Sequence, residues 1–178
     1  YFSEIDSWGK VVDWAQPLYN KAGIAGTSVE DSSVQSVIDE IKLKTSEPNE
    51  RVMSALNYVQ DQIRYLGLEM GVNSHQPSLA EDTLVRRYGD CKDKVVLFIA
   101  LLKGMDIDAY PVLVDTADGL DLPLQPASIN AFNHVIAKVE MSDMTYWLDP
   151  TMNYQKGPLQ SIYQANYQYG LVIKPGVK

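Results

Sequence analysis

The feature that most constrains this chain is an uninterrupted apolar run over residues 95–102, preceded by a polar turn. A helix that is apolar on every side must be buried on every side. Asp90 is suited to cap the N-terminus of this helix, and Asp93, three residues on, resembles a capping box with aspartate in place of glutamate. Gly104 is typical of a helix end. The sequence therefore predicts a buried central helix that begins at Cys91.

The first half of the chain predicts further helices. Ser7 can cap a first helix, which Pro17 would end or kink. Apolar residues at spacings of three and four mark a second helix over residues 34–41. Pro48 suits the first turn of a third helix, whose apolar stripe reaches Ile63. Loops are expected over residues 23–27 and 71–77, and a short polar helix over residues 79–86.

The second half changes to strand patterns. Residues 110–114, 132–139 and 145–148 are rich in β-branched and aromatic side chains. The acidic, proline-containing stretch over residues 115–130 is a long connection that could border a substrate cleft. Helices followed by strands favour an α+β fold, in which the Cys91 helix packs on an antiparallel sheet.

The bulk composition excludes several classes of protein. A chain of 178 residues, 46% of them hydrophobic, can form one domain with a substantial core, so we expect residues 1–178 to be a single domain. The net charge of −8 argues against nucleic acid as a partner. No apolar stretch approaches the roughly 20 residues that span a bilayer. Because Cys91 is the only cysteine, an internal disulfide and a multi-cysteine metal site are excluded. No cofactor is expected.

Cys91 is the candidate nucleophile because of its place at the first turn of the central helix. The helix dipole and the unpaired N–H groups there favour the thiolate over the thiol. Lysines at positions 92 and 94 act in the same direction, and aspartates at positions 90 and 93 oppose it. An imidazolium partner would decide the balance, and His134 is the candidate.

Asp149 is the candidate carboxylate for His134, because a hairpin between the last two strands can bring them together. If facing residue numbers add to 285, His134 faces Thr151 and Asp149 is its diagonal neighbour on the same face. If they add to 283, Asp149 lies directly opposite His134. An even sum would put the two side chains on different faces of the sheet. His75 is the rival base, without a carboxylate placed to orient it.

Acyl transfer also needs donors for the developing oxyanion. The backbone N–H of Cys91 at the helix start is one candidate, and the amide of Gln76 in an upstream loop is a second. Tyr88 competes with Gln76 for that role. Tyr88 and Asn133, which stand near the nucleophile and the base in sequence, are also candidates for substrate contacts.

Two other charged groups have alternative interpretations. The acidic side chains spaced three apart from Asp115 to Asp121 could bind calcium, but they lack the Gly and Glu of a known calcium loop and are better explained as solvated. The basic residues near Cys91 could receive an anionic substrate group, although a solvated helix flank is favoured. These basic residues are Arg86, Arg87, Lys92 and Lys94.

Taken together, several blocks closely resemble the transglutaminase-like superfamily, and the bacterial branch assigned as cysteine proteases in particular. The blocks are residues 86–94, the aliphatic helix, residues 109–113, Asn133-His134-Val135 and residues 146–151, in the family's order. The likeness covers at least residues 63–151, and residues 8–19 and 170–173 are also similar to that branch. Met105-Asp106-Ile107 stands where relatives usually have Leu-Gly-Ile, a departure that leaves the triad intact.

The resemblance implies a papain-like α+β fold, with Cys91 as nucleophile, His134 as base and Asp149 as the orienting carboxylate. The superfamily includes transglutaminases, peptidases, amidases and inactive members, so it indicates a chemistry and no single substrate. In many relatives the domain follows a β-sandwich in a larger extracytoplasmic protein. We therefore expect a periplasmic or cell-envelope location and a flanking β-sandwich domain, although this segment carries no signal sequence.

The leading functional hypothesis is acyl transfer from a peptide or protein amide through a thioester on Cys91. Hydrolysis of the thioester, as in a peptidase or amidase, is slightly favoured because it needs no dedicated amine pocket. Attack by an amine, as in a protein-glutamine transglutaminase, is the alternative. A different class of function is a non-catalytic domain that binds a peptide or a cell-wall component. An intact triad argues against that reading.

Overall fold

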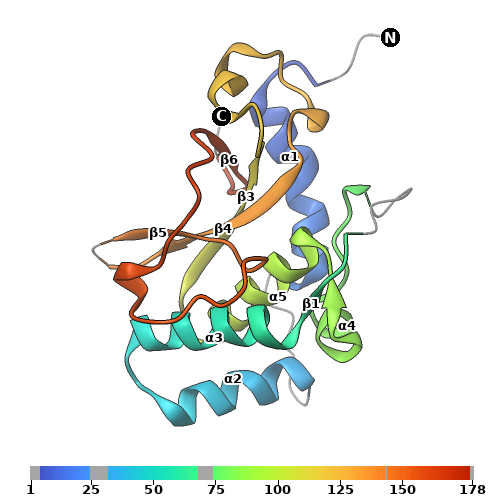
Figure 1. Ribbon diagram of the computed structural model, residues 1–178. Helices are drawn as coiled ribbons and strands as arrows, with labels where there is room; N and C mark the ends of the chain where they lie inside the picture. Colours follow the sequence, from blue (N-terminus) through green and yellow to red (C-terminus); the bar gives the residue numbers. More distant parts are fainter. Residues whose placement is uncertain (1–4, 25–31, 68–73, 143, 177–178) are drawn as a thin grey trace.

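A buried helix, α5 (Cys91–Lys103), forms the centre of the molecule in the computed structural model, which describes residues 5–24, 32–67, 74–142 and 144–176 (Figure 1). Residues 95–102 are fully buried except for Ala100, which is partly buried. The expected capping box is present: the Asp90 carboxylate accepts from the Asp93 backbone N–H, and the Asp93 carboxylate accepts from that of Asp90. The prediction of a central helix beginning at Cys91 is confirmed.

The remaining helices pack around α5, and the predictions of a second helix over residues 34–41, a third helix and a short polar helix all hold. Pro48 occupies the first turn of its helix, and the apolar stripe of that helix is buried up to Ile63. The short polar helix is also present. Of the expected loops, residues 25–27 and 71–73 lie outside the described residues. The elements are α1 (Trp8–Tyr19), η1 (Asn20–Ile24), α2 (Ser33–Lys44), α3 (Pro48–Gln62) and α4 (Ala80–Arg86), with a parallel pair of two-residue strands, β1 (Arg64–Tyr65) and β2 (Tyr88–Gly89).

Of the two alternatives predicted for Pro17, that it ends or that it kinks the first helix, the first is wrong. Helix α1 continues to Tyr19 and passes into the π-helical turn η1, where Gly23 has a φ of 119°. A proline removes one backbone donor and crowds the preceding turn, and here the chain coils on past the end of α1 as far as Gly23, whose backbone is not helical. Tyr19, the last residue of α1, is buried beside Cys91.

The second half forms one antiparallel sheet with the strand order β5-β4-β3-β6. One face of the sheet packs against α5, and the α+β prediction is confirmed. Residues 115–130, between β3 and β4, contain two short 3-10 helices. The elements are β3 (Asp108–Val114), η3 (Gly119–Leu124), η4 (Ile129–Ala131), β4 (His134–Glu140), β5 (Thr145–Leu148) and β6 (Gly170–Val172).

The register of the β4–β5 hairpin agrees with one of the two expected odd registers. Ala137 faces Leu148 and Glu140 faces Thr145, so facing residue numbers add to 285. Residue 143, at the expected turn, lies outside the described residues. This register places His134 and Asp149 on the same face at the end of the ladder.

A long segment, residues 150–169, connects β5 at one edge of the sheet to β6 at the other, and we call it the strap. Because β5 and β6 are the two edge strands, the strap has to cross the sheet. In Figure 1 the orange-to-red strap passes alongside α3, through η5 (Leu159–Ser161), and then runs to β6. Tyr167 packs on the sheet face that points away from α5. Among the described residues no helix is both long and apolar enough to cross a bilayer.

Candidate active site

Cys91 is the first residue of α5 and lies at the wall of a cavity of about 350 Å³. Cys91 is 3% exposed, and His134 lines the same cavity. Cys91 is thus enclosed by protein except where it borders this cavity. The expected juxtaposition of Cys91 and His134 is present.

Gly89 lets the chain turn tightly into the start of α5. A Cβ atom at this position would lie 2.7 Å from Asp93 Cβ and 3.0 Å from Asp93 Oδ2. Such contacts force something to move, so a side chain at position 89 would displace the carboxylate that completes the capping box. The glycine thus helps to fix the backbone on which Cys91 sits.

His134 and Asp149 form the hydrogen-bonded pair that the hairpin register favours. His134 Nε2 lies 2.8 Å from Asp149 Oδ2, and the two side chains are 12% and 2% exposed. Because Asp149 occupies Nε2, the other ring nitrogen, Nδ1, is left to meet the thiol of Cys91. The geometry of the pair agrees with the sequence prediction, and the catalytic roles of the three residues stay a prediction.

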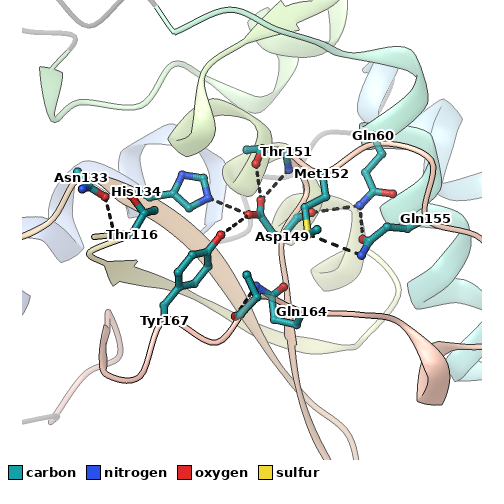
Figure 2. A network of polar contacts seen from close by, with 11 residues as sticks. Gln60, Thr116, Asn133, His134, Asp149, Thr151, Met152, Gln155, Gln164 and Tyr167 are labelled. Carbon is teal, nitrogen blue, oxygen red and sulfur yellow. Dashed lines mark hydrogen bonds and ion pairs between the residues drawn. The ribbon is translucent and has the colours of Figure 1, made fainter. Parts of the chain in front are cut away.

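The carboxylate of Asp149 is held by several donors, as Figure 2 shows. Oδ1 accepts from the backbone N–H of Thr151 at 2.8 Å and from its hydroxyl at 2.7 Å. Oδ2 also accepts from the hydroxyl of Tyr167 at 3.4 Å, and the carbonyl oxygen of Asp149 accepts from Gln60 Nε2 at 3.1 Å. A carboxylate fixed in this way orients the imidazole that it contacts.

These contacts favour the charged form of both partners. Burial acts to lower the pKa of His134, but hydrogen bonds with Asp149 and Cys91 outweigh burial and raise the pKa to about 10. Burial acts to raise the pKa of Asp149, yet the hydrogen bond from His134, assisted by those from Thr151, holds it below its ordinary value. His134 is therefore an imidazolium at neutral pH, next to both Cys91 and a carboxylate.

Helix α1 supplies part of the cavity wall, which the sequence analysis did not anticipate. Trp14 and Tyr19 line the cavity, and the Trp14 ring meets the His75 ring edge to face at a centroid distance of 5.4 Å. Burial, and then the electrostatic effect of Cys91, Asp90 and Asp93, raise the pKa of Tyr19 well above its ordinary value. Its phenol is therefore a neutral hydrogen-bond donor beside Cys91.

Gln76 and Tyr88 do not line the cavity that contains Cys91. They line a separate cavity of about 210 Å³ with Arg86 and Asp93. Among the described residues of that loop, Ser74 and His75 reach the Cys91 cavity. The geometry thus gives no support to Gln76 as an oxyanion donor for Cys91, or to Tyr88 as a substrate contact there.

Asn133 does line the Cys91 cavity, as expected for a substrate contact. Its amide also organises the neighbouring turn: Oδ1 accepts from the Thr116 N–H at 3.0 Å, and Nδ2 donates to Asp115 Oδ1 at 3.1 Å. The same Asp115 oxygen accepts from two backbone N–H groups of its own turn. Asp115 therefore shapes a loop, and within the described residues no group of three or more metal-binding side chains exists.

The prediction of a solvated helix flank is wrong for Lys92 and Lys94, which are 3% and 0% exposed. Lys92 forms an ion pair with Asp90. Lys94 Nζ donates to the carbonyl oxygen of Ile63, at the C-terminus of α3, at 2.6 Å. Burial lowers the pKa of Lys94 to about 8 against the opposing charge of Asp149. A helix buried on every side has no solvated flank, so these cations serve internal partners.

Comparisons with known proteins identify the family. The profile of the transglutaminase-like superfamily matches residues 35–155. A "putative protease" from Parabacteroides distasonis superimposes with a TM-score of 0.62 at 12% identity, over 78% of this chain and 26% of that protein. A "putative cysteine protease" from Cytophaga hutchinsonii gives a TM-score of 0.45 at 15% identity, over 91% of this chain and 43% of that protein. No curated protein matches significantly. The chain belongs to the transglutaminase-like superfamily.

Proposed function

We propose that this protein is a cysteine-based acyl-transfer enzyme that acts on peptide or protein amides. The observation that carries the proposal is the position of His134, which is hydrogen-bonded to Asp149 on one side and to Cys91 on the other. An imidazolium beside a cysteine favours the thiolate, and the thiolate is the nucleophile.

In the proposed reaction the sulfur of Cys91 attacks the carbonyl carbon of the substrate amide. The C–N bond breaks, and the proton of His134 passes to the leaving amine, so that a thioester and a free amine form. In the second half, His134 accepts a proton from water, whose oxygen attacks the thioester and releases a carboxylic acid and Cys91. Asp149 keeps the imidazole in one orientation and stabilises its charged form throughout.

The oxyanion that develops on the substrate needs hydrogen-bond donors in the same cavity. The backbone N–H of Cys91 at the start of α5 is one proposed donor. The phenol of Tyr19 is the other, because it lines the cavity, is buried and stays neutral beside Cys91. Tyr19 thus takes the place that the sequence analysis gave to Gln76.

Hydrolysis is the favoured outcome over transfer to an amine. The Parabacteroides distasonis protein that shares this fold is named a "putative protease". Among the described residues, the cavity walls supply no acidic side chain to receive a cationic amine. The lack of acidic side chains bears only on the binding of an amine, so product analysis is the way to separate hydrolysis from amine transfer.

Trapping with an electrophilic peptide tests the nucleophile. A peptide vinyl ester or acyloxymethyl ketone should add once to the wild-type chain, and mass spectrometry should place the adduct on Cys91, the only cysteine. His134→Ala should slow labelling by about 10²–10⁴-fold, the range for loss of an acid–base partner. Equal labelling rates for the two proteins would remove His134 from the mechanism.

A peptide library with and without a primary amine then separates hydrolysis from transfer. Hydrolysis should give free carboxylates whose yield is insensitive to the amine. Amide products formed with the added amine would instead identify a transglutaminase. Retention of peptides by Cys91→Ala, with no product from the wild-type protein, would indicate a binding domain.

A further inference from the structure

On the sheet face away from α5 lies a second cavity, of about 500 Å³, between the sheet and the strap; we call it the outer groove. We propose that the outer groove is a docking site for an extended, uncharged peptide segment. The proposal rests on the groove alone and not on the proposed acyl transfer, because binding can be measured in a protein without the nucleophile.

Charge restricts what the outer groove can hold. No Asp, Glu, Lys, Arg or His is present among the described residues that line it, although 21% of the whole chain is charged. An ionic group placed there would lose its hydration without gaining a partner of opposite charge. Phosphates, carboxylates and metal ions therefore do not fit, and the occupant is neutral where it contacts the groove.

The edge of β5 offers backbone hydrogen bonds along the groove. Strand β5 pairs only with β4, and in the described part of the chain no backbone hydrogen bond covers its other edge. The five consecutive residues 144–148 all line the groove. Because successive side chains point to opposite faces, an unbroken run of lining residues means that the groove follows the strand edge. An extended peptide can add to such an edge as a further strand.

The floor of the groove is covered, and the apolar surface that it offers lies at its rim. Val112, Val114 and Ile136 form an apolar floor that is already buried, with Tyr167 packed against it. The exposed rings of Trp147 and Tyr169 are the apolar surface against which peptide side chains can pack. In the wall, the buried Oε1 of Gln164 has no hydrogen-bond partner in the described part of the chain, while its Nε2 donates to the Ala165 carbonyl at 3.3 Å. Because that oxygen has no exposed surface, a peptide N–H reaches it only if the Gln164 side chain rotates toward the groove.

A neutral saccharide is the other occupant that an uncharged groove with aromatic walls could take. Trp147 and Tyr169 are 42% and 52% exposed and could stack on a sugar ring. The free edge of β5 favours a peptide, because its row of backbone N–H and C=O groups has the spacing of a second extended backbone. Apolar peptide side chains also gain by burial against the exposed aromatic rings at the rim.

The outer groove lies next to the triad. Tyr167 forms part of its wall, donates to Asp149, and meets the His134 ring at a centroid distance of 5.9 Å. His134 in turn lines the cavity that contains Cys91. A docked segment would therefore sit on the opposite side of the His134–Tyr167 contact from the nucleophile.

Titration of the whole chain carrying Cys91→Ala tests the proposal by NMR. The probe is an acetylated and amidated octapeptide of alternating valine and serine. Saturable shifts are expected at residues 144–148 and in the strap. The same peptide with glutamate in place of serine should bind at least about tenfold more weakly, a change that corresponds to about 1.4 kcal/mol.

Two substitutions locate the binding. Gln164→Glu adds a charge to the groove with almost no change of shape and should weaken binding about tenfold. Gln62→Glu is the matched control, because Gln62 is exposed on α3 outside the groove. Trp147→Ala should weaken binding because it removes an aromatic ring that lines the groove. This second variant keeps the proposal testable if the Gln164→Glu variant does not fold.

Three results would overturn the proposal: no saturable shifts with the uncharged peptide, shifts that avoid the groove, or equal weakening by Gln164→Glu and Gln62→Glu. Tighter binding of chitotetraose than of the peptide would assign the groove to saccharides. Electrophile labelling of Cys91 in the wild-type chain is independent of all these outcomes, so failure of the groove and failure of the proposed acyl transfer are distinguishable.

Discussion

At the scale of single residues, the site depends on buried charges that are partnered. Asp149, 2% exposed, receives hydrogen bonds from His134, Thr151 and Tyr167. A buried charge without a partner is costly, so removing one member of such a set affects the others. This coupling allows single substitutions to be interpreted as tests of the relay.

Asp149→Asn should slow electrophile labelling of Cys91 at pH 7 by about 10²–10⁴-fold, the scale of an acid–base partner. An amide has nearly the same shape as the carboxylate, but it does not stabilise the imidazolium of His134. The labelling rate is measured by mass spectrometry, with thermal unfolding as a control for folding. Labelling as fast as in the wild-type chain would show that the carboxylate is not needed.

The pH dependence of stability separates His134 from Lys94. The raised pKa of His134 contributes stability that is fully present below about pH 6.5 and is lost as the pH rises through about 10. The lowered pKa of Lys94 acts with the opposite sign: its destabilising charge is present below about pH 8 and is relieved toward about pH 10.4, the ordinary value of lysine. In the wild-type chain the two effects should oppose each other between about pH 8 and 10.

Lys94→Met should therefore remove the compensating effect of the lysine. The free energy of unfolding of the Lys94→Met variant should keep falling as the pH rises to 10. The free energy of unfolding of the wild-type chain should level off between about pH 8 and 10. Urea denaturation at pH 7, 8, 9 and 10 measures the difference. Parallel curves for the two proteins would mean that Lys94 does not change its protonation in this range.

At the scale of elements, the β4–β5 hairpin and the start of α5 could be predicted from sequence, and the contribution of α1 could not. Side chains alternate between the two faces of a strand, and this alternation together with a short turn allows only a few registers of the hairpin. The observed register, in which facing residue numbers add to 285, is one of them. Trp14 and Tyr19 lie more than 70 positions before Cys91, and their apolar stripe indicates only that α1 is buried. Which cavity a buried helix faces depends on tertiary packing, which has no local signal.

Gly89→Ala tests the tight entry to α5. The added methyl group would meet Asp93 and disturb the capping box, so we expect a loss of about 1–2 kcal/mol in the free energy of unfolding. Gly157→Ala is a comparison position with open space around it, although its φ of 112° adds strain of its own. Urea denaturation measures both. If the free energy of unfolding of Gly89→Ala equals that of the wild-type chain, the capping box tolerates a side chain at position 89.

Tyr167→Phe tests the contact between the strap and the triad. The ring stays against His134, while the hydroxyl that donates to Asp149 is lost. Labelling of Cys91 should slow by about fivefold, the effect of about 1 kcal/mol from one hydrogen bond. Tyr169→Phe, on an exposed ring, is the matched control and should label at the wild-type rate. Identical rates for both variants would leave the strap without a role in the relay.

At the scale of the whole molecule, the two sheet faces have different surroundings. One face packs on α5, which begins with Cys91, and the other bears the strap and the outer groove. Because the strand order is β5-β4-β3-β6, the strap has to cross the sheet. In this order β3 pairs with β6, a strand almost 60 residues later in the chain. Such long-range pairing is not visible in local patterns, so the contact of Tyr167 with His134 and Asp149 could not be predicted from the sequence.

The central claim is that folding places Cys91 and His134 in one charge-coupled pair. NMR titration of the His134 ring in the wild-type chain and in Cys91→Ala tests it most directly. The account predicts that His134 titrates near pH 10 in the wild-type chain and at a clearly lower pH once the sulfur is removed. A His134 titration that is the same in both proteins would contradict the account, because the imidazole would then be independent of the thiol.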